Sequence, residues 1–427
     1  MSTQEPSDGL AAREAAVQLL EATLARRGGL DEALGSGAVA RLDPRDRSFA
    51  RALVMAALRH LGPIDRALEA KLQRPPPERV KTLLRLGAAQ AFWLDVPAFA
   101  AVDTTVTLAD RDRVSRPFKG LVNAVLRGLL RDGPPPADPE ALAPAWLYAR
   151  WKSAFGEADA AALAARIAEE PATDVTPRDP ADAAALAEAL EGEPVGGSVR
   201  VGRKGDITLW PGYAEGRWWV QDAAAAVPAR LLDVQPGERA LDLCAAPGGK
   251  TLQLAAAGAS VVAVDRSAAR LRRLAENLAR TGLAAEVVVA DAANWKDERA
   301  FDAVLLDAPC ASTGTFRRNP DVLWAIRPGD IGALAAVQSQ LLDAAAGRVK
   351  PGGRLVYCVC SLEPEEGEAQ AAAFLKRHPD FETVPAQPGE GGAPEASVTA
   401  KGWLRILPHH LPGGLDGFFA ARFTRRA

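Results

Sequence analysis

Two of the four cysteines stand where apolar, strand-like runs end, and a thiol in such a place can act as a nucleophile. Cys310 follows the run FDAVLLDAP, and Cys360 closes the run GRLVYCVC. A thiolate adds to an electron-poor carbon, and a nearby base can later remove a proton so that the thiolate leaves again. Cys244 and Cys358 fit within strand patterns, where a cysteine usually packs as a small hydrophobe. We therefore expect chemistry at Cys310 and Cys360.

Carbon 5 of cytosine is a carbon that needs this kind of help, because it is a poor nucleophile on its own. A thiolate that adds to carbon 6 turns carbon 5 into an enamine carbon, which can attack a methyl sulfonium. In the loop DAPC, Asp307 could hold the N3 edge of the base and Pro309 would stiffen the chain. Methylation of an adenine amino group would favour an aromatic residue in this loop, and the loop has none. The loop therefore favours cytosine carbon 5.

The segment LDLCAAPGGKT, residues 241–251, has the features of a nucleoside site. Its paired glycines let a backbone approach a ligand closely. Asp265 ends the run VVAVD and could accept from ribose hydroxyls, and Asp291 ends VVVAD and could accept from an adenine amino group. The G-x-G-x-x-G pattern is absent, and Cys244 stands where a P-loop needs its first glycine. S-adenosylmethionine fits best, and another nucleotide or a purely structural glycine turn are the alternatives.

These motifs need a parallel sheet to bring them together. Apolar runs alternate with helical segments from Glu238 onward, which predicts a parallel sheet with helices on both faces. Ligands of such sheets bind beyond the carboxyl ends of the strands, where each motif falls. The fold class is therefore an α/β, Rossmann-like methyltransferase sheet, with two further strands predicted in GWLRILP and DGFFAARFT.

The preceding part of the chain predicts two other kinds of structure. Residues 10–132 carry apolar side chains at helical spacing without a strand signal, so we expect an all-helical domain over residues 1–135. A proline-rich linker follows over 136–144. Residues 145–225 read as helices followed by a small α+β, RRM-like unit with strands at SVRV and DITLW and a helix at ADAAALAEAL. The catalytic domain would then span residues 226–427.

Composition excludes several classes of protein. No run approaches the roughly 18 apolar residues of a membrane span. The N-terminus lacks the pattern of a signal peptide, so we expect a cytoplasmic protein that does not bind a membrane. Four histidines and one close cysteine pair do not form two sets of zinc ligands, so no metal site is expected.

The net charge is −3, but residues 1–133 hold 20 basic and 16 acidic residues. This excess of basic residues could bind a phosphate backbone, although basic side chains on solvated helix faces are the simpler explanation.

The motifs together resemble a known family. LDLCAAPGGKT, DAPCASTGTFRRNPDVLW and YCVCSLEPEEGE resemble the three signature segments of the RNA cytosine-C5 methyltransferases of the Nol/Nop/Sun group. The helical front, ending in FKGLVNAVLRGLL, resembles the NusB-like RNA-binding domain. This layout is similar to that of the RsmB (Sun/Fmu) family of 16S ribosomal RNA methyltransferases, and the resemblance covers nearly the whole chain.

The resemblance implies a role for each matching residue. S-adenosylmethionine would be held by Cys244, Ala245, Ala246, Pro247, Gly248, Gly249, Lys250, Asp265, Asp291 and Asp307. Cys360 would be the nucleophile, and Cys310 would assist release of the methylated RNA. Lys250, Arg317 and Arg318 would contact the RNA, with Asp321 nearby; a solvated loop is the alternative for the last three.

Two departures and two alternatives accompany this resemblance. Val359 stands where the family usually has threonine. The segment TPRDP at 176–180 replaces a Leu-Arg-Val-Asn run of the family, so we assign no RNA contact to Arg178. We expect a monomer that acts on RNA, with 16S ribosomal RNA as the substrate. Transfer RNA as the substrate and a non-catalytic, NusB-like RNA-binding adaptor are the alternatives.

Overall fold

The computed structural model describes residues 9–25, 30, 33 and 39–427, and these form two compact units. Unit 1 comprises residues 1–170 and 316–327, and unit 2 comprises residues 171–315 and 328–427. The helices of residues 145–170, which we expected beside the small α+β sheet, belong to unit 1 by their contacts. The predicted domain limits are finer than this division and stay a prediction.

The regular elements in the described residues of unit 1 are all helices, as predicted for residues 10–132, and the predicted linker 136–144 also holds a short helix. Its 3-10 turns lie at Val39–Arg41 and Arg116–Phe118, and its α-helices are α1 (Leu10–Ala25), α3 (Pro44–Arg59), α4 (Leu61–Glu69), α5 (Glu78–Trp93), α6 (Ala98–Arg111), α7 (Lys119–Asp132), α8 (Pro139–Leu142), α9 (Ala145–Phe155), α10 (Glu157–Ala165) and α15 (Val322–Ala325). Helix α3 shows how the sequence sets a boundary. Its Pro44 occupies the first turn, and the Asp43 side chain accepts a hydrogen bond from the Asp46 backbone N–H.

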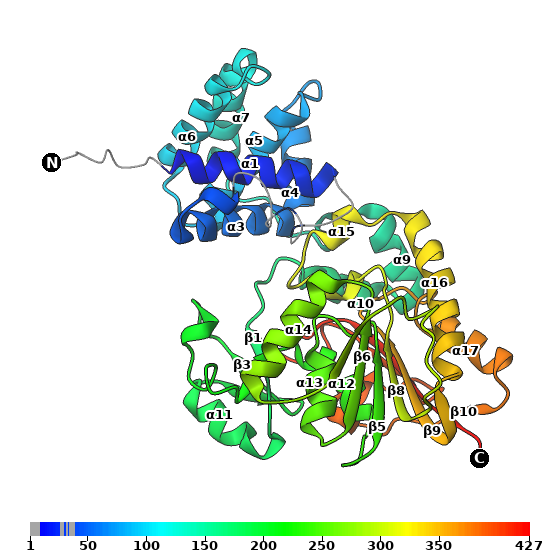
Figure 1. Ribbon diagram of the computed structural model, residues 1–427. Coiled ribbons are helices and arrows are strands. Elements are labelled where there is room, and N and C mark those ends of the chain that lie inside the picture. The colour runs from blue at the N-terminus through cyan, green and yellow to red at the C-terminus, as the bar shows by residue number, and fades with distance from the viewer. Residues whose placement is uncertain (1–8, 26–29, 31–32, 34–38) are drawn as a thin grey trace. The chain divides into compact units, whose positions relative to one another are not determined.

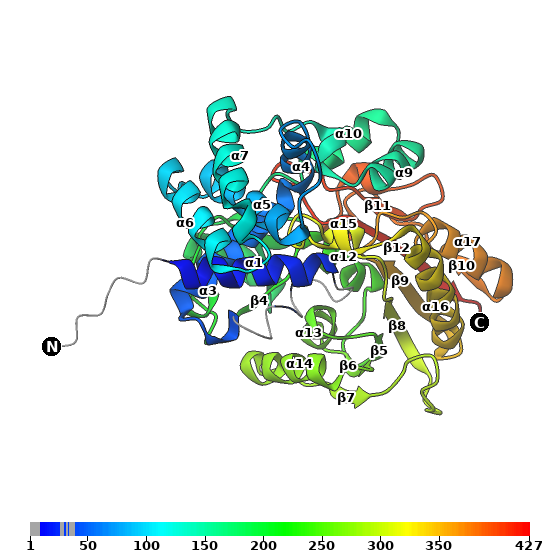
Figure 2. The same ribbon diagram turned by 90° about the horizontal axis from the view of Figure 1, so that it is seen from above.

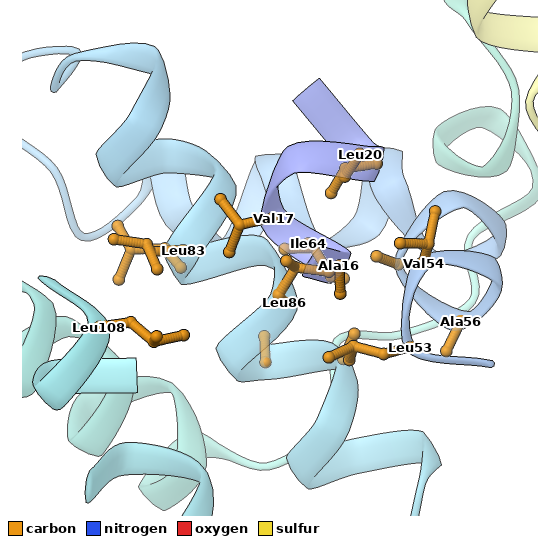
Figure 3. Close-up of a cluster of buried hydrophobic side chains, with 14 of the residues drawn as sticks. Ala16, Val17, Leu20, Leu53, Val54, Ala56, Ile64, Leu83, Leu86 and Leu108 are labelled. Atoms are coloured by element: carbon orange, nitrogen blue, oxygen red, sulfur yellow. The ribbon is translucent and has the colours of Figure 1, made fainter. Parts of the chain in front are cut away.

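The core of unit 1 is built from apolar side chains of six helices. Figure 3 shows Val17 and Leu20 of α1 close to Leu53 and Val54 of α3, with Ile64 of α4 beside them. Helices α5, α6 and α7 contribute further leucines to the same cluster. Burial of these side chains follows the helical period that the sequence shows, so packing of the apolar faces stabilises the unit.

A segment from far along the sequence completes unit 1. Residues 316–327, which we call the strap, follow the Cys310 loop in the sequence but pack with the helices of unit 1. The ring of Phe316 lies 5.8 Å from that of Trp151, and the Trp324 indole N–H donates to the Leu58 carbonyl at 3.2 Å. The Asp321 carboxylate accepts from the Leu30 N–H at 2.9 Å.

Unit 2 begins with a small antiparallel sheet and one helix. The strands have the order β2-β3-β1-β4 and the helix is α11, with bounds β1 (Thr173–Pro177), β2 (Glu193–Val195), β3 (Ser198–Val201), β4 (Trp218–Val220) and α11 (Ala183–Ala189). The predicted strand SVRV is confirmed as β3, and the predicted helix as α11. The predicted strand DITLW is wrong, because the Asp206 side chain accepts from the Thr208 N–H and starts a 3-10 turn at Ile207–Leu209.

The large sheet of unit 2 carries the predicted motifs. Its order is β10-β12-β9-β8-β5-β6-β7, with β11 paired to β12, and its strands are β5 (Arg239–Leu243), β6 (Ser260–Asp265), β7 (Glu286–Val289), β8 (Phe301–Asp307), β9 (Val349–Val359), β10 (Phe381–Thr383), β11 (Leu404–Ile406) and β12 (Phe418–Arg425). Strands β5 to β9 are parallel, as predicted. Strands β10, β11 and β12 pair antiparallel, so the sheet is mixed (Figure 1).

Helices cover both faces of this sheet (Figure 2). One face packs against α16 (Pro328–Ala346) and α17 (Glu368–Arg377), and the other against α12 (Ala223–Leu232), α13 (Gly249–Ala256) and α14 (Ala268–Thr281). Strand β5 lies between β6 and β8. From β5 the chain first builds β6 and β7 on one side of it, and then crosses over to build β8 and β9 on the other side. A sheet with helices on both faces opens a ligand crevice at such a reversal.

No helix in the described ranges is both long enough and apolar enough to cross a membrane.

Candidate active site

The loop after β5 forms a close-packed turn at the reversal point of the sheet. Its first residue, Cys244, has a φ of 61°, and Gly248 has a φ of 108°. A Cβ atom at Gly248 would lie 2.3 Å from Cδ1 of Leu274, so only glycine fits there without a rearrangement. Helix α13 begins directly after this glycine, and its N-terminal N–H groups favour negative charge or acceptor atoms of a ligand. The structure thus gives the predicted cofactor loop the form of a cradle.

Two carboxylates lie at the carboxyl ends of the next two strands. Asp265, at the end of β6, is buried and accepts hydrogen bonds from the N–H groups of Ala246 at 3.1 Å and Ser267 at 2.8 Å. Asp291, beyond β7, is exposed and accepts from the Ala293 N–H at 3.0 Å. The Ala290 N–H donates to the Asp265 carbonyl and joins the two strand ends. Acceptors at one sheet edge beside a glycine cradle fit the adenosine part of S-adenosylmethionine.

Lys250 and Asp307 form a partly buried ion pair between α13 and the end of β8. The Lys250 Nζ lies 2.8 Å from Oδ2 of Asp307 and 5.0 Å from the ring centre of Phe418. Burial alone would lower the pKa of Lys250, but the neighbouring Asp307 carboxylate raises it above the usual value. Lys250 therefore stays charged. The Cys358 thiol donates to the other carboxylate oxygen, Oδ1, at 3.5 Å.

The two predicted thiols face each other across the ends of β8 and β9. Their Sγ atoms lie 3.5 Å apart, and the Ser312 hydroxyl lies 3.9 Å from Sγ of Cys310 and 3.6 Å from Sγ of Cys360. The Gly314 N–H donates to the Cys360 carbonyl at 3.0 Å, so backbone hydrogen bonds also join the two loops. Both side chains are partly exposed, whereas the thiol of Cys358 is buried in the sheet.

The four thiols differ in pKa because their surroundings differ. The hydrogen bond from Cys310 lowers the pKa of Cys360, although burial opposes this effect, and the same bond together with burial raises the pKa of Cys310. Burial raises the pKa of Cys244 to about 12 and that of Cys358 well above its usual value. Only the thiolate is a good nucleophile, so Cys360 is the thiol best prepared to attack.

The chain is similar to two families of known proteins. Residues 229–424 match the model of the 16S rRNA methyltransferase RsmB/F family, and residues 10–131 match the NusB family. The chain is 37% identical, over 99% of its length and 98% of the relative's, to ribosomal RNA small subunit methyltransferase B of Xanthomonas campestris pv. campestris. The corresponding protein of Pseudomonas syringae pv. tomato is 36% identical over 97% of each chain. The chain belongs to the RsmB/F methyltransferase family.

Solved structures support the same fold for this RsmB/F protein. The crystal structure of PH0851 matches with a TM-score of 0.76 and 26% identity, over 99% of this chain and 100% of that one. A methyltransferase homologue from Pyrococcus horikoshii matches with a TM-score of 0.55 and 27% identity, over 65% of this chain and 93% of that one. The predicted resemblance is confirmed, and the protein is an S-adenosylmethionine-dependent RNA methyltransferase with a NusB-like helical region.

The predicted RNA-contacting residues of this RsmB/F protein lie in different environments. Arg317 is only 2% exposed and sits in the strap within unit 1, so its side chain does not suit the RNA contact that we predicted. Arg318 is exposed, and its RNA contact stays a prediction. Lys250 is buried and paired with Asp307 at 2.8 Å, and its RNA contact stays a prediction. The guanidinium of Arg178 donates to the Thr281 carbonyl at 2.9 Å.

Sequence reasoning missed two buried polar side chains beside the thiols. Glu366 and Gln338 hydrogen-bond to each other at 3.0 Å, and each also bonds to the loop that carries Cys310. The only signal in the sequence is an acidic residue six positions after Cys360, and nothing there distinguishes it from the exposed Glu365. Over the residues that the structure covers, no group of three or more His, Cys, Asp or Glu side chains could hold a metal ion.

Proposed function

We propose that this enzyme methylates carbon 5 of a cytosine in 16S ribosomal RNA through a covalent bond between Cys360 and carbon 6 of the base. The observation that carries the proposal is the 3.5 Å approach of the Cys310 and Cys360 thiols, with the pKa of Cys360 lowered. A single thiol would suffice for nucleophilic addition, whereas a second thiol beside it suits the later removal of a proton. The curated relatives named ribosomal RNA small subunit methyltransferase B support 16S ribosomal RNA as the substrate.

The proposed reaction uses the two thiols in sequence. Bound S-adenosylmethionine would supply a methyl group on a sulfonium. Cys360 loses its proton to solvent, and its thiolate adds to carbon 6 of the cytosine, which makes carbon 5 nucleophilic. Once Cys360 is bonded to carbon 6, the Cys310 thiol no longer donates to a thiolate and loses its own proton to solvent. After methylation of carbon 5, the Cys310 thiolate accepts the carbon 5 proton, directly or through Ser312, and the bond between Cys360 and carbon 6 breaks, which returns the Cys360 thiolate. The high pKa of Cys310 makes its thiolate the stronger base of the two.

The Lys250–Asp307 ion pair offers a match to the Watson–Crick edge of cytosine. A carboxylate only accepts hydrogen bonds, and an ammonium only donates them. Asp307 would therefore accept from the exocyclic amino group, and Lys250 would donate to N3 and stabilise the charge that develops there. This arrangement modifies the sequence-based prediction, in which Asp307 alone would serve the N3 edge. The separation of 2.8 Å between the two charged groups suits adjacent atoms of one base edge.

Bisulfite sequencing of ribosomal and transfer RNA tests this function. RNA from cells that carry the gene, cells that lack it, and cells complemented with Cys360→Ala would be compared. We expect one cytosine of 16S ribosomal RNA to resist conversion only where the wild-type enzyme is present. A gene-dependent cytosine in transfer RNA would move the substrate assignment to the first alternative. Absence of any gene-dependent cytosine would refute the proposal and leave the RNA-binding adaptor. The expected monomeric state and cytoplasmic location stay predictions.

A further inference from the structure

Glu366 is a fully buried carboxylate directly behind the two thiols. Its oxygens accept hydrogen bonds from three different parts of unit 2. The Ala311 N–H donates to both oxygens at 3.0 and 3.2 Å, the Ser361 hydroxyl donates to Oε2 at 2.5 Å, and the Gln338 amide donates to Oε1 at 3.0 Å. Burial raises the pKa of Glu366, and these donors oppose the rise because they favour the charged form.

The partners of Glu366 are the residues that come directly after the thiols in sequence. Ala311 follows Cys310 in the loop after β8, and Ser361 follows Cys360 in the loop after β9. One carboxylate therefore holds both loops at once. If either hydrogen bond broke, the loop concerned could shift while its neighbour stayed in place, and the two sulfur atoms would move apart.

Gln338 of α16 extends this arrangement to the other side of the first loop. Its amide also donates to the Pro309 carbonyl at 2.9 Å, directly before Cys310, and its Oε1 accepts from the Tyr357 hydroxyl at 3.3 Å. The same hydroxyl donates to the Glu366 carbonyl at 2.5 Å. Gln338 thus holds the residue before Cys310, and Glu366 holds the residue after it. Such a network fixes geometry because each buried polar group has a defined partner.

A carboxylate suits this position and an amide does not. An ionised carboxylate only accepts, and here every contact to its two oxygens comes from a donor. Replacement by glutamine would put an N–H donor in place of one oxygen, and the Ala311 N–H faces both oxygen positions, so two donors would meet whichever oxygen is replaced. A buried donor left without an acceptor is costly, so the loops would rearrange to relieve it.

We propose that Glu366, together with Gln338, is a positioning residue that holds the Cys310 and Cys360 thiols within reach of each other. The effect on methylation rests on the proposed function, whereas the effect on the thiol geometry does not. The Glu366 carboxylate accepts from Ala311, Ser361 and Gln338 rather than from a thiol, so it acts on the thiols through these residues.

The test measures the thiol pair without RNA or S-adenosylmethionine. Phenylarsine oxide binds two neighbouring thiols at once, because two As–S bonds form as water leaves. Wild-type protein, Glu366→Gln and the matched control Glu365→Gln, an exposed neighbour, would be titrated with it in the full-length chain. We expect Glu366→Gln to lose about tenfold or more in affinity, because the second thiol no longer lies at the same effective concentration. Glu365→Gln should bind as the wild type does.

Methylation kinetics supply the second measurement. We expect Glu366→Gln to lose about 100-fold in kcat, the cost of misplaced reacting groups, with the KM for S-adenosylmethionine unchanged. If Glu366→Gln does not fold, Gln338→Leu, which removes the donor shared by Pro309 and Glu366, should show the same two losses. Wild-type affinity for phenylarsine oxide in a folded Glu366→Gln variant would overturn the proposal. A wild-type enzyme that binds the arsenical but forms no 5-methylcytosine would refute the proposed function and leave the positioning role standing.

Discussion

The Sγ atoms of Cys310 and Cys360 lie 3.5 Å apart although the two residues are 50 positions apart in the sequence. The approach follows from the pairing of β8 and β9, which are parallel and place Asp307 opposite Cys358. Cys310 and Cys360 each follow this pair of opposite residues by a few positions, at the ends of the two strands. The thiol pair is therefore set by backbone geometry and refined by the side chains behind it.

Removal of the Cys310 thiol should trap the covalent complex. Cys310→Ala retains the nucleophile and lacks the group that we propose to accept the carbon 5 proton, so the bond between Cys360 and the RNA should persist. We expect a protein–RNA band that survives a denaturing gel, and turnover lower by about 100-fold or more. The double variant Cys310→Ala/Cys360→Ala is the control and should show no such band. Normal turnover without a band in Cys310→Ala would contradict the assigned role.

The acidity of Cys360 should depend on its neighbour. In the wild type the hydrogen bond from Cys310 lowers the pKa of Cys360, so thiolate forms there at a lower pH than at Cys310. Iodoacetamide should therefore alkylate Cys360 first as the pH rises from 6 to 9. In Cys310→Ala that hydrogen bond is lost while burial remains, and the alkylation profile of Cys360 should move to higher pH. Peptide mass spectrometry gives both rates, and an unchanged profile in the variant would show that Cys310 does not lower the pKa of Cys360.

The local sequence was enough to predict the chemistry-bearing residues at strand ends. The runs before Asp265, Cys310 and Cys360 are apolar and short, and parallel strands bring their carboxyl ends to one edge, so position along the chain predicts position in the site. The paired glycines of residues 241–251 predicted a close backbone turn, and the structure gives Gly248 there a positive φ.

What the sequence could not show depends on contacts between distant segments. Glu366 and Glu365 are identical in type and adjacent, and the buried Glu366 differs from the exposed Glu365 by the hydrogen bonds that its carboxylate accepts from Ala311, Ser361 and Gln338. Arg317 was expected beside RNA or in a solvated loop, and it is buried because the strap packs with helices of unit 1 that are distant in the sequence. The 3-10 turn at Ile207–Leu209 arose from a side-chain contact of Asp206 that strand periodicity does not register.

A buried carboxyl group under the cofactor loop should make unit 2 less stable as the pH rises. Burial raises the pKa of Asp242 to about 7, and the hydrogen bond from the Thr251 hydroxyl at 2.6 Å only partly opposes this rise. An unfolded aspartate titrates near pH 4, so between these values the folded state binds the extra proton. The stabilisation is therefore present at low pH and is lost as the pH approaches 7, by about 3 kcal/mol between pH 5 and 8.

Asp242→Asn should remove most of this pH dependence, because an amide keeps the hydrogen bond from Thr251 and does not titrate. Hydrogen exchange of the β5 and β8 amides at pH 5 and pH 8, corrected for the intrinsic exchange rate, reports the opening free energy of unit 2 alone. The decisive quantity is the difference between the two pH values, not the absolute stability of either variant. An equal pH-dependent loss in wild type and Asp242→Asn would show that another group causes it.

The packing of the strap should depend on the buried guanidinium of Arg59 in α3. Arg59 donates to the carbonyls of Ile167 at 3.2 Å, Glu169 at 2.9 Å and Arg317 at 2.6 Å, and burial lowers its pKa to about 10. Arg59→Ala would leave these carbonyls without their donor, at a cost of about 1–3 kcal/mol for each one that stays buried. We expect faster hydrogen exchange over residues 316–327, while Arg51→Ala, an exposed position of the same helix, should exchange as the wild type does. Because the strap begins six residues after Cys310, its loosening should also lower the rate of methylation. Unchanged exchange in the strap of a folded Arg59→Ala variant would show that the aromatic contacts of Phe316 and Trp324 hold it without the guanidinium.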